Sequence, residues 1–215
     1  LLRRCSNITK LGLNLETLHD TGILSDLFLS LKTNWPEKLV SLELQIYQLE
    51  PEEGILEQIS YPQLLKLKCI LHEAISVNDA ESQLNLLLEG NQNLTSLHLD
   101  SLSGQKIDIP FHVCKSFKKI KYTGCLPITP KSIENLQKCT NLQNLSLQEF
   151  TFDAISSFES FLFSKRCRQL THLHLDSMDL TIPIETNNLT NLQFFSALNN
   201  SCLSENELQE LGTHC

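Results

Sequence analysis

One hydrophobic pattern recurs along the chain: apolar, two variable residues, apolar, one variable residue, apolar. Its eight copies begin at Ile8, Leu39, Leu64, Leu94, Phe117, Leu142, Leu170 and Leu192. The last two apolar positions of each copy are separated by one variable residue, so they point to one face of an extended strand. The pattern therefore predicts eight short strands, each buried on one face.

Several stretches between these strands have the features of helices. In one of them, Thr129 is a candidate N-cap and Pro130 suits the first turn of a helix. In another, Ser204 and Glu207 have the spacing of a capping box. We expect helices over residues 80–88, 129–136, 154–163 and 204–211.

A strand followed by a helix, repeated at intervals of roughly 20 to 30 residues, is typical of leucine-rich repeats. We therefore expect an α/β fold: a leucine-rich-repeat solenoid, or horseshoe, with a parallel sheet on its concave side and helices outside. Residues 1–215 are predicted to form a single domain of about eight repeats. Because the chain opens inside a repeat and no capping segment is evident, we expect it to be a fragment of a longer protein.

The cysteines occupy a repeated position. Cys5, Cys114, Cys139 and Cys167 each lie three residues before the first apolar position of a copy, and Cys215 precedes a possible further copy. A free cysteine behaves as a small apolar residue. We expect Cys114, Cys139 and Cys167 to be buried, reduced and close together at successive corners between helix and strand.

The run 136–147, LQKCTNLQNLSL, resembles the cysteine-containing class of leucine-rich repeat, which is typical of F-box proteins. These proteins are the substrate receptors of SCF-type ubiquitin ligases. The resemblance implies that the repeats bind a target protein, while an F-box upstream of Leu1 docks the ligase adaptor. The chain departs from the family pattern at Leu102, Phe150 and Met178, where the family often has Asn or Cys. The intervals from the first copy to the second and from the third to the fourth are also long for the class.

These departures leave a second interpretation open. The chain is then a leucine-rich-repeat receptor or scaffold without an F-box, such as a nucleotide-dependent immune sensor or a regulator of a small GTPase. The sequence preceding Leu1 discriminates between the two. An F-box is a helical segment, whereas a sensor has a phosphate-binding loop.

Charge and composition limit the classes of partner that the chain can bind and the cellular compartment in which we expect it. The formal net charge of −8 disfavours binding to nucleic acid or to an anionic membrane. No apolar run reaches the length of a transmembrane helix. Disulfides in a secreted protein are an alternative use of the cysteines, favoured by Asn-x-Ser/Thr sites at Asn7, Asn93, Asn144, Asn188 and Asn199. Because three of these sites lie in or beside the strand motif, we expect a cytoplasmic or nuclear protein with free thiols.

Catalysis has little support in the sequence. The chain has no phosphate-binding glycine loop, no G-x-S-x-G and no H-E-x-x-H motif. We expect no enzymatic activity, no cofactor and no metal. His172 and Asp176 lie at the two ends of one strand and hence about 13 Å from each other, too far to share one ion.

The outward strand positions give a polar wall of varied chemistry, which suits one specific protein partner. Lys66, Lys68, Lys119 and Lys121 are its basic concentration, either a patch for an acidic or phosphorylated segment or ordinary solvated lysines. The predicted partner-binding residues on the concave face are Lys66, Lys68, His98, Asp100, Lys119, Lys121, His172, His174 and Asp176.

Overall fold

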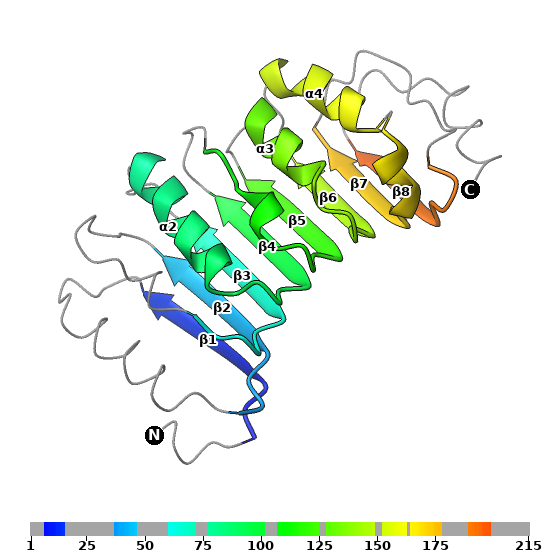
Figure 1. Ribbon diagram of the computed structural model, residues 1–215. Coiled ribbons are helices and arrows are strands. Elements are labelled where there is room, and N and C mark those ends of the chain that lie inside the picture. Colours follow the sequence, from blue (N-terminus) through cyan, green and yellow to red (C-terminus); the bar gives the residue numbers. More distant parts are fainter. Residues whose placement is uncertain are drawn as a thin grey trace.

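Eight strands form a single open sheet in which every neighbouring pair is parallel (Figure 1). The computed structural model describes residues 7–15, 37–46, 60–71, 77–101, 107–124, 128–148, 152–162, 164–177 and 189–198. The strands follow one another in chain order and coincide with the eight predicted copies. They are β1 (Lys10–Leu15), β2 (Ser41–Ile46), β3 (Lys66–Leu71), β4 (Ser96–Ser101), β5 (Lys119–Gly124), β6 (Asn144–Gln148), β7 (His172–Asp176) and β8 (Phe194–Leu198).

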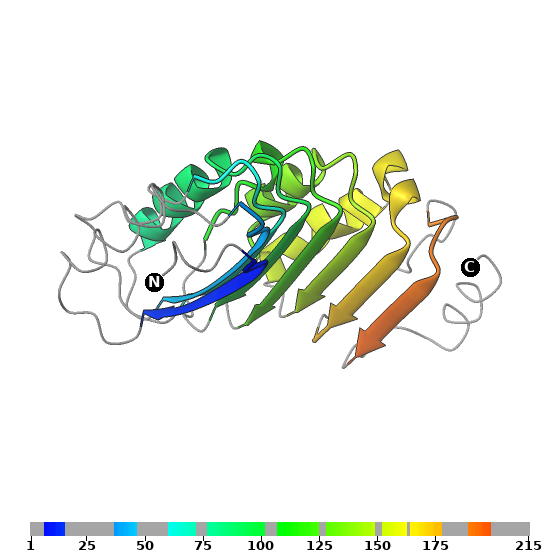
Figure 2. The same cartoon turned by 90° about the horizontal axis from the view of Figure 1, so that it is seen from below.

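The described helices pack on one face of this sheet, and no described helix covers the other face (Figures 1 and 2). They are α2 (Val77–Glu89), α3 (Pro130–Leu136) and α4 (Phe152–Leu162), with short 3-10 turns η4 (Phe111–Val113) and η5 (Lys165–Gln169). Three predicted helices are confirmed, and the fourth, 204–211, lies outside the described residues. Within the described part of the chain, no helix is long and apolar enough to cross a bilayer.

Local chemistry explains where α3 begins. The side chain of Thr129 accepts a hydrogen bond from the backbone N–H of Ser132, and Pro130 occupies the first turn, as the sequence predicts. The cap satisfies a helix N–H that has no partner within the helix. Pro130 helps to define the first residue of the helix. The fixed backbone angle of proline suits the first turn, and the N–H that proline lacks would have no partner there.

The register places equivalent residues of all eight copies side by side. Leu42 pairs with Leu67, Leu67 with Leu97, and so on across the sheet to Leu173 and Phe195. From β2 to β7 these inward side chains are buried in one continuous core together with the apolar faces of the helices. At the two ends the core thins: Leu11, Leu13 and Phe195 are only partly buried. The architecture is thus a solenoid-like stack of strand and helix layers.

The corner cysteines are buried free thiols, as predicted for Cys114, Cys139 and Cys167. Their sulfur atoms donate to backbone carbonyls: Cys114 to Leu88 O at 3.4 Å, Cys139 to Phe111 O at 3.4 Å and Cys167 to Phe161 O at 3.0 Å. Burial raises the pKa of each thiol to about 12, and Cys114 adds to this effect at Cys139. Cys5 and Cys215 lie outside the described residues.

Asparagine side chains tie neighbouring turns together at a position that sequence reasoning did not single out. Asn93, Asn141 and Asn191 each precede the first apolar residue of a copy, and each Nδ2 donates to a backbone carbonyl of the copy before. The acceptors are Pro62 O at 2.9 Å, Lys115 O at 2.9 Å and Arg168 O at 2.6 Å. All three bonds are exposed to solvent, and each joins one turn to the turn before it at the same position of the repeat.

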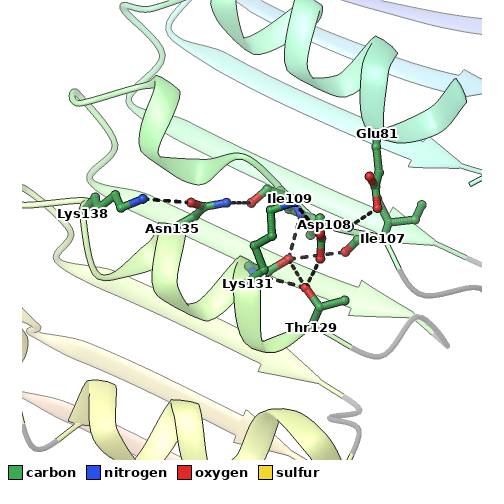
Figure 3. A network of polar contacts seen from close by, with 9 residues as sticks. Glu81, Ile107, Asp108, Ile109, Thr129, Lys131, Asn135 and Lys138 are labelled. Atoms are coloured by element: carbon green, nitrogen blue, oxygen red, sulfur yellow. Dashed lines mark hydrogen bonds and ion pairs between the residues drawn. The ribbon is translucent and has the colours of Figure 1, made fainter. Parts of the chain in front are cut away.

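A second polar network joins α2, the segment 107–110 and α3 on the helical side (Figure 3). The Asp108 carboxylate accepts from Thr129 Oγ1 at 2.5 Å and lies 2.8 Å from Lys131 Nζ, while the Asp108 N–H donates to Glu81 at 2.8 Å. Ser132 Oγ accepts from the Ile109 N–H at 2.7 Å. The network anchors the segment 107–110 to the helices on both sides of it.

Candidate functional site

The face of the sheet away from the helices carries the predicted binding residues. We call it the open wall. It consists of three rows of outward side chains. The first row runs through Lys10, Ser41, Lys66, Ser96, Lys119, Asn144, His172 and Phe194, and the middle row through Gly12, Glu43, Lys68, His98, Lys121, Ser146, His174 and Ser196. The third row includes Asn14, Gln45, Ile70, Asp100 and Thr123 on β1–β5, and Gln148 and Asp176 on β6 and β7.

The structure brings the four predicted lysines together around β4. Lys66 and Lys119 lie on either side of Ser96, and Lys68 and Lys121 lie on either side of His98. Neighbouring strands are about 4.8 Å apart, so each pair of lysines spans roughly 10 Å across β4. Lys66 and Lys119 are exposed, while Lys68 and Lys121 are half-buried.

One member of this group is not available as a free cation. The Lys68 Nζ atom lies 2.6 Å from Oε1 of Glu43 on β2, and Lys10 Nζ approaches Oε2 of the same carboxylate at 3.4 Å. The hydrogen bond from Lys68 is the main reason that the pKa of Glu43 lies below its usual value. Lys68 belongs to the predicted group of lysines, and the structure adds that its charge is paired with Glu43. Glu43 lies in the same row as Lys68, one strand earlier. Aligning the eight copies of the motif therefore places the two residues side by side, and this ion pair could have been predicted from the sequence.

Three of the predicted lysines remain without an ion pair among the described residues: Lys66, Lys119 and Lys121. Two of them stand on the same strand, β5, and both point to the open wall. This local positive charge contrasts with the chain's net charge of −8. An anionic group is attracted to β5 while the net charge of the chain repels it, which favours a defined point of attachment.

His98 lies in the middle of the lysine group. Its Nε2 atom is 3.1 Å from Oγ1 of Thr123 on β5. Burial lowers the pKa of His98, and the charges of Lys121 and Lys68 lower it further, against the opposing carboxylates of Asp100 and Glu43. The neutral imidazole therefore predominates at neutral pH, where it offers a hydrogen bond without adding to the positive charge.

The other end of the open wall carries an aromatic pair. The His172 ring stacks on the Phe194 ring of β8 with 5.9 Å between centroids and 26° between planes. Thr171 Oγ1 lies 3.0 Å from His172 Nδ1 and holds the imidazole in place. Phe194 is 51% exposed, so part of its ring is available for contact on the open wall. Phe194 was not among the predicted site residues. The signal for it was present in the sequence, because it is an apolar residue at an outward strand position.

The remaining predicted residues lie on the same wall but in separate surroundings. Asp100 faces Ile70 and Thr123 in the third row, and His174 has Ser146 and Ser196 as its row neighbours. The Asp176 carboxylate accepts from Ser177 Oγ at 3.2 Å. Within the described ranges, no three His, Cys, Asp or Glu side chains gather closely enough to hold a metal ion.

Open hollows also occur among the described residues of the helical side, two of them beside α3. One, of about 800 Å³, lies between α3 and α4 and is lined by Glu134, Gln137, Lys138 and four serines. The other, of about 610 Å³, lies over the network of Asp108 and Lys131 (Figure 3). Both are lined mainly by polar side chains, whereas the open wall joins free cations to an exposed aromatic ring. The open wall is therefore the stronger candidate for binding.

Comparison of the chain with protein-family models and with curated proteins gave no match.

Proposed function

We propose that this chain is a leucine-rich-repeat solenoid whose concave surface, the open wall, binds a protein partner rather than catalysing a reaction. The observation that carries the proposal is the contrast between the two faces of the sheet. Described helices cover one face, and the other face presents charged and aromatic side chains in register on rigid strands. A varied, exposed and preorganised surface of this kind favours specific recognition because little ordering is required on binding.

The chemistry of the open wall defines the kind of partner. Lys119 and Lys121 favour an acidic or phosphorylated segment, since a lysine ammonium donates to carboxylate and phosphate oxygens. Screened attraction between exposed charges contributes more to the association rate and to specificity than to affinity. The exposed Phe194 ring supplies apolar contact area, and aromatic residues are enriched where binding energy is concentrated.

For the cellular role, we propose the substrate-recognition region of an F-box-type receptor of an SCF ubiquitin ligase. The supporting observation is the cysteine at successive corners, which is buried at Cys114, Cys139 and Cys167 and resembles the F-box class of repeat. The target then binds the open wall, and the ligase adaptor binds an F-box upstream of Leu1. A receptor or scaffold without an F-box shares the wall but lacks the adaptor.

The binding proposal is tested by charge reversal on β5. Partners are captured with the wild-type chain and identified, and binding is then measured with the Lys119→Glu/Lys121→Glu variant at two salt concentrations. We expect binding to weaken by about tenfold and its salt dependence to flatten, because screened attraction is lost. The matched control is Lys115→Glu/Lys138→Glu, which changes the charge equally at exposed positions outside the three rows. Loss of binding in the control alone, with the β5 variant unaffected, contradicts the proposal.

The ligase role requires a separate measurement. The full-length protein is tested for co-purification with the SCF adaptor and for ubiquitin transfer to the captured partner. Adaptor binding together with partner ubiquitination that the β5 variant reduces supports the F-box role. Partner binding without any adaptor favours the receptor or scaffold.

A further inference from the structure

The lysines of β5 and the aromatic pair of β7 and β8 share one row of the open wall. The strand register runs from Lys119 through Asn144 and His172 to Phe194. Three strand steps therefore separate the free cation from the exposed ring. At about 4.8 Å for each step, the two anchors are roughly 14 Å apart.

On β6, between the lysines of β5 and the aromatic pair of His172 and Phe194, the floor of the open wall is low and uncharged. β6 contributes Asn144 and Ser146 to the open wall, both half-buried, and the Asn144 side chain is already engaged with Thr171 at 3.2 Å. A chain lying across the strands therefore meets no long or charged side chain at these two positions of β6. The anchors differ in chemistry, since one offers ammonium groups and the other the face of a phenyl ring.

Resting on the proposed function, we propose that the partner is an extended segment with an anionic side chain at one position and an aromatic or other large apolar side chain four residues away, lying across β5 to β8. Four residues of extended chain cover roughly 14 Å, at about 3.4 Å per residue. The direction in which the two side chains point matters as much as the length of the segment between them. Side chains four apart in an extended chain point to the same face, whereas those three or five apart point to opposite faces.

The two contacts act together. A single exposed charge contact is weak because water and salt screen it. The contact between one apolar side chain and a half-exposed ring is also weak, because it buries only part of the apolar surface of each group. When both groups belong to one segment of matching span, binding of the first raises the effective concentration of the second. The acid over β5 thus selects partners only when the apolar group reaches Phe194.

The test uses synthetic peptides with Phe placed two, three, four, five or six residues from the anionic residue, on either side, with alternating Thr and Gln in between. One set carries phosphoserine and another carries Glu, which distinguishes phosphate from carboxylate as the anion. Affinity for the intact chain is measured by titration of isotope-labelled protein followed by NMR. We expect the spacing of four to bind about tenfold more tightly than three or five, and six to bind more weakly than four.

Variants assign the preference to the two anchors. Phe194→Ser and Lys119→Ser should each abolish the preference for four, while Phe194→Tyr should retain it because the ring remains. Lys66→Ser, two strands from Lys119, is the matched control and should leave the optimum at four. Equal affinity at all spacings, no detectable binding of any peptide, or a preference that survives Phe194→Ser overturns the inference. If the captured partner still depends on Lys119 and Lys121 in that case, the proposed function stands and only the spacing rule fails.

Discussion

β4 and β7 have nearly the same sequence and different surroundings. β4 reads SLHLD over residues 96–100, and β7 reads HLHLD over residues 172–176. Their middle histidines occupy the same row, yet His98 lies between Lys68 and Lys121, whereas His174 lies between Ser146 and Ser196. His98 also reaches Thr123 and is held in its neutral form by burial and by the two lysines.

The chemistry of an outward residue in a stacked sheet is therefore set by its row neighbours. Those neighbours come from other turns, a whole repeat away in the chain. The inward residues behave differently, because leucine meets leucine in most turns. The two regions should therefore match in the stability and thiol protection of their cores and differ in the ionisation and binding of their outward residues.

The largest expected effect is protection of the corner thiols behind both regions. Burial raises the pKa of Cys114 and Cys167 from 9.0 to about 12, so the thiolate fraction at neutral pH falls about a thousandfold. Since the thiolate is the reactive form, alkylation in the native protein should be strongly slowed at both sites. The measurement is iodoacetamide labelling followed by mass spectrometry, with the denatured chain as reference. Rapid native labelling at either cysteine disproves a uniform core.

The next prediction compares two core leucines, Leu97 in β4 and Leu173 in β7. Both are fully buried at equivalent positions, with exposures of 0%. Leu97→Ala and Leu173→Ala should each lower the free energy of unfolding by about 2–5 kcal/mol, because each removes buried apolar surface and leaves a cavity. Urea denaturation measures the loss. A loss well below about 2 kcal/mol in either variant contradicts the prediction that its leucine fills a shared, tightly packed core.

A smaller effect is expected from releasing Lys68. Glu43→Gln removes the carboxylate and leaves β3 with an additional free cation, so an acidic partner should bind a few-fold more tightly at low salt. The variant should lose no more than about 1 kcal/mol of stability, because the ion pair is partly exposed. Since the folded pKa of Glu43 is lowered from 4.5, its contribution is present above that pH and is lost as the pH falls through the folded pKa. Denaturation at pH 7 and pH 3 should therefore show a larger difference between wild type and variant at pH 7. An equal difference at both pH values shows that the effect is not electrostatic.

The smallest effect concerns the titration of His98. Replacing both row neighbours in Lys68→Ser/Lys121→Ser should raise the pKa of His98 toward its ordinary value of 6.5, leaving chiefly the shift due to burial. Because the pKa of His98 is lower in the folded state than in the unfolded chain, protonation favours the unfolded chain. The contribution of His98 to the free energy of unfolding is therefore greatest above about pH 6.5 and decreases as the pH falls below it. Its ring resonances, followed by NMR from pH 4 to 8, measure the change. Lys119→Ser, outside the middle row, is the matched control. A pKa of His98 that does not move in the double variant contradicts the role assigned to the row neighbours.

The fold was accessible from the sequence because its determinants are local and repeated. The apolar positions alternate within each strand, and the same alternation recurs eight times, so strand position and row register follow together. The cap of α3 was equally readable, since Thr129, Pro130 and Ser132 are close together in the chain. The positions of Lys119, Lys121 and His172 on the open wall followed from the same alternation. The corner cysteines were placed correctly because their offset from the motif is constant.

Pairing was decided only by the tertiary structure. In the sequence, β3 and β5 each carry two lysines at outward positions. In the structure, Lys68 of β3 forms an ion pair with Glu43, whereas Lys119 and Lys121 of β5 have no ion pair among the described residues. The asparagine ladder at Asn93, Asn141 and Asn191 likewise depends on which carbonyl of the preceding turn lies within hydrogen-bonding distance. The physical reason is range. The burial of an apolar residue depends on which face of its own strand it occupies, whereas a hydrogen bond or ion pair depends on a distance of a few ångströms between residues that lie a whole repeat apart in the chain.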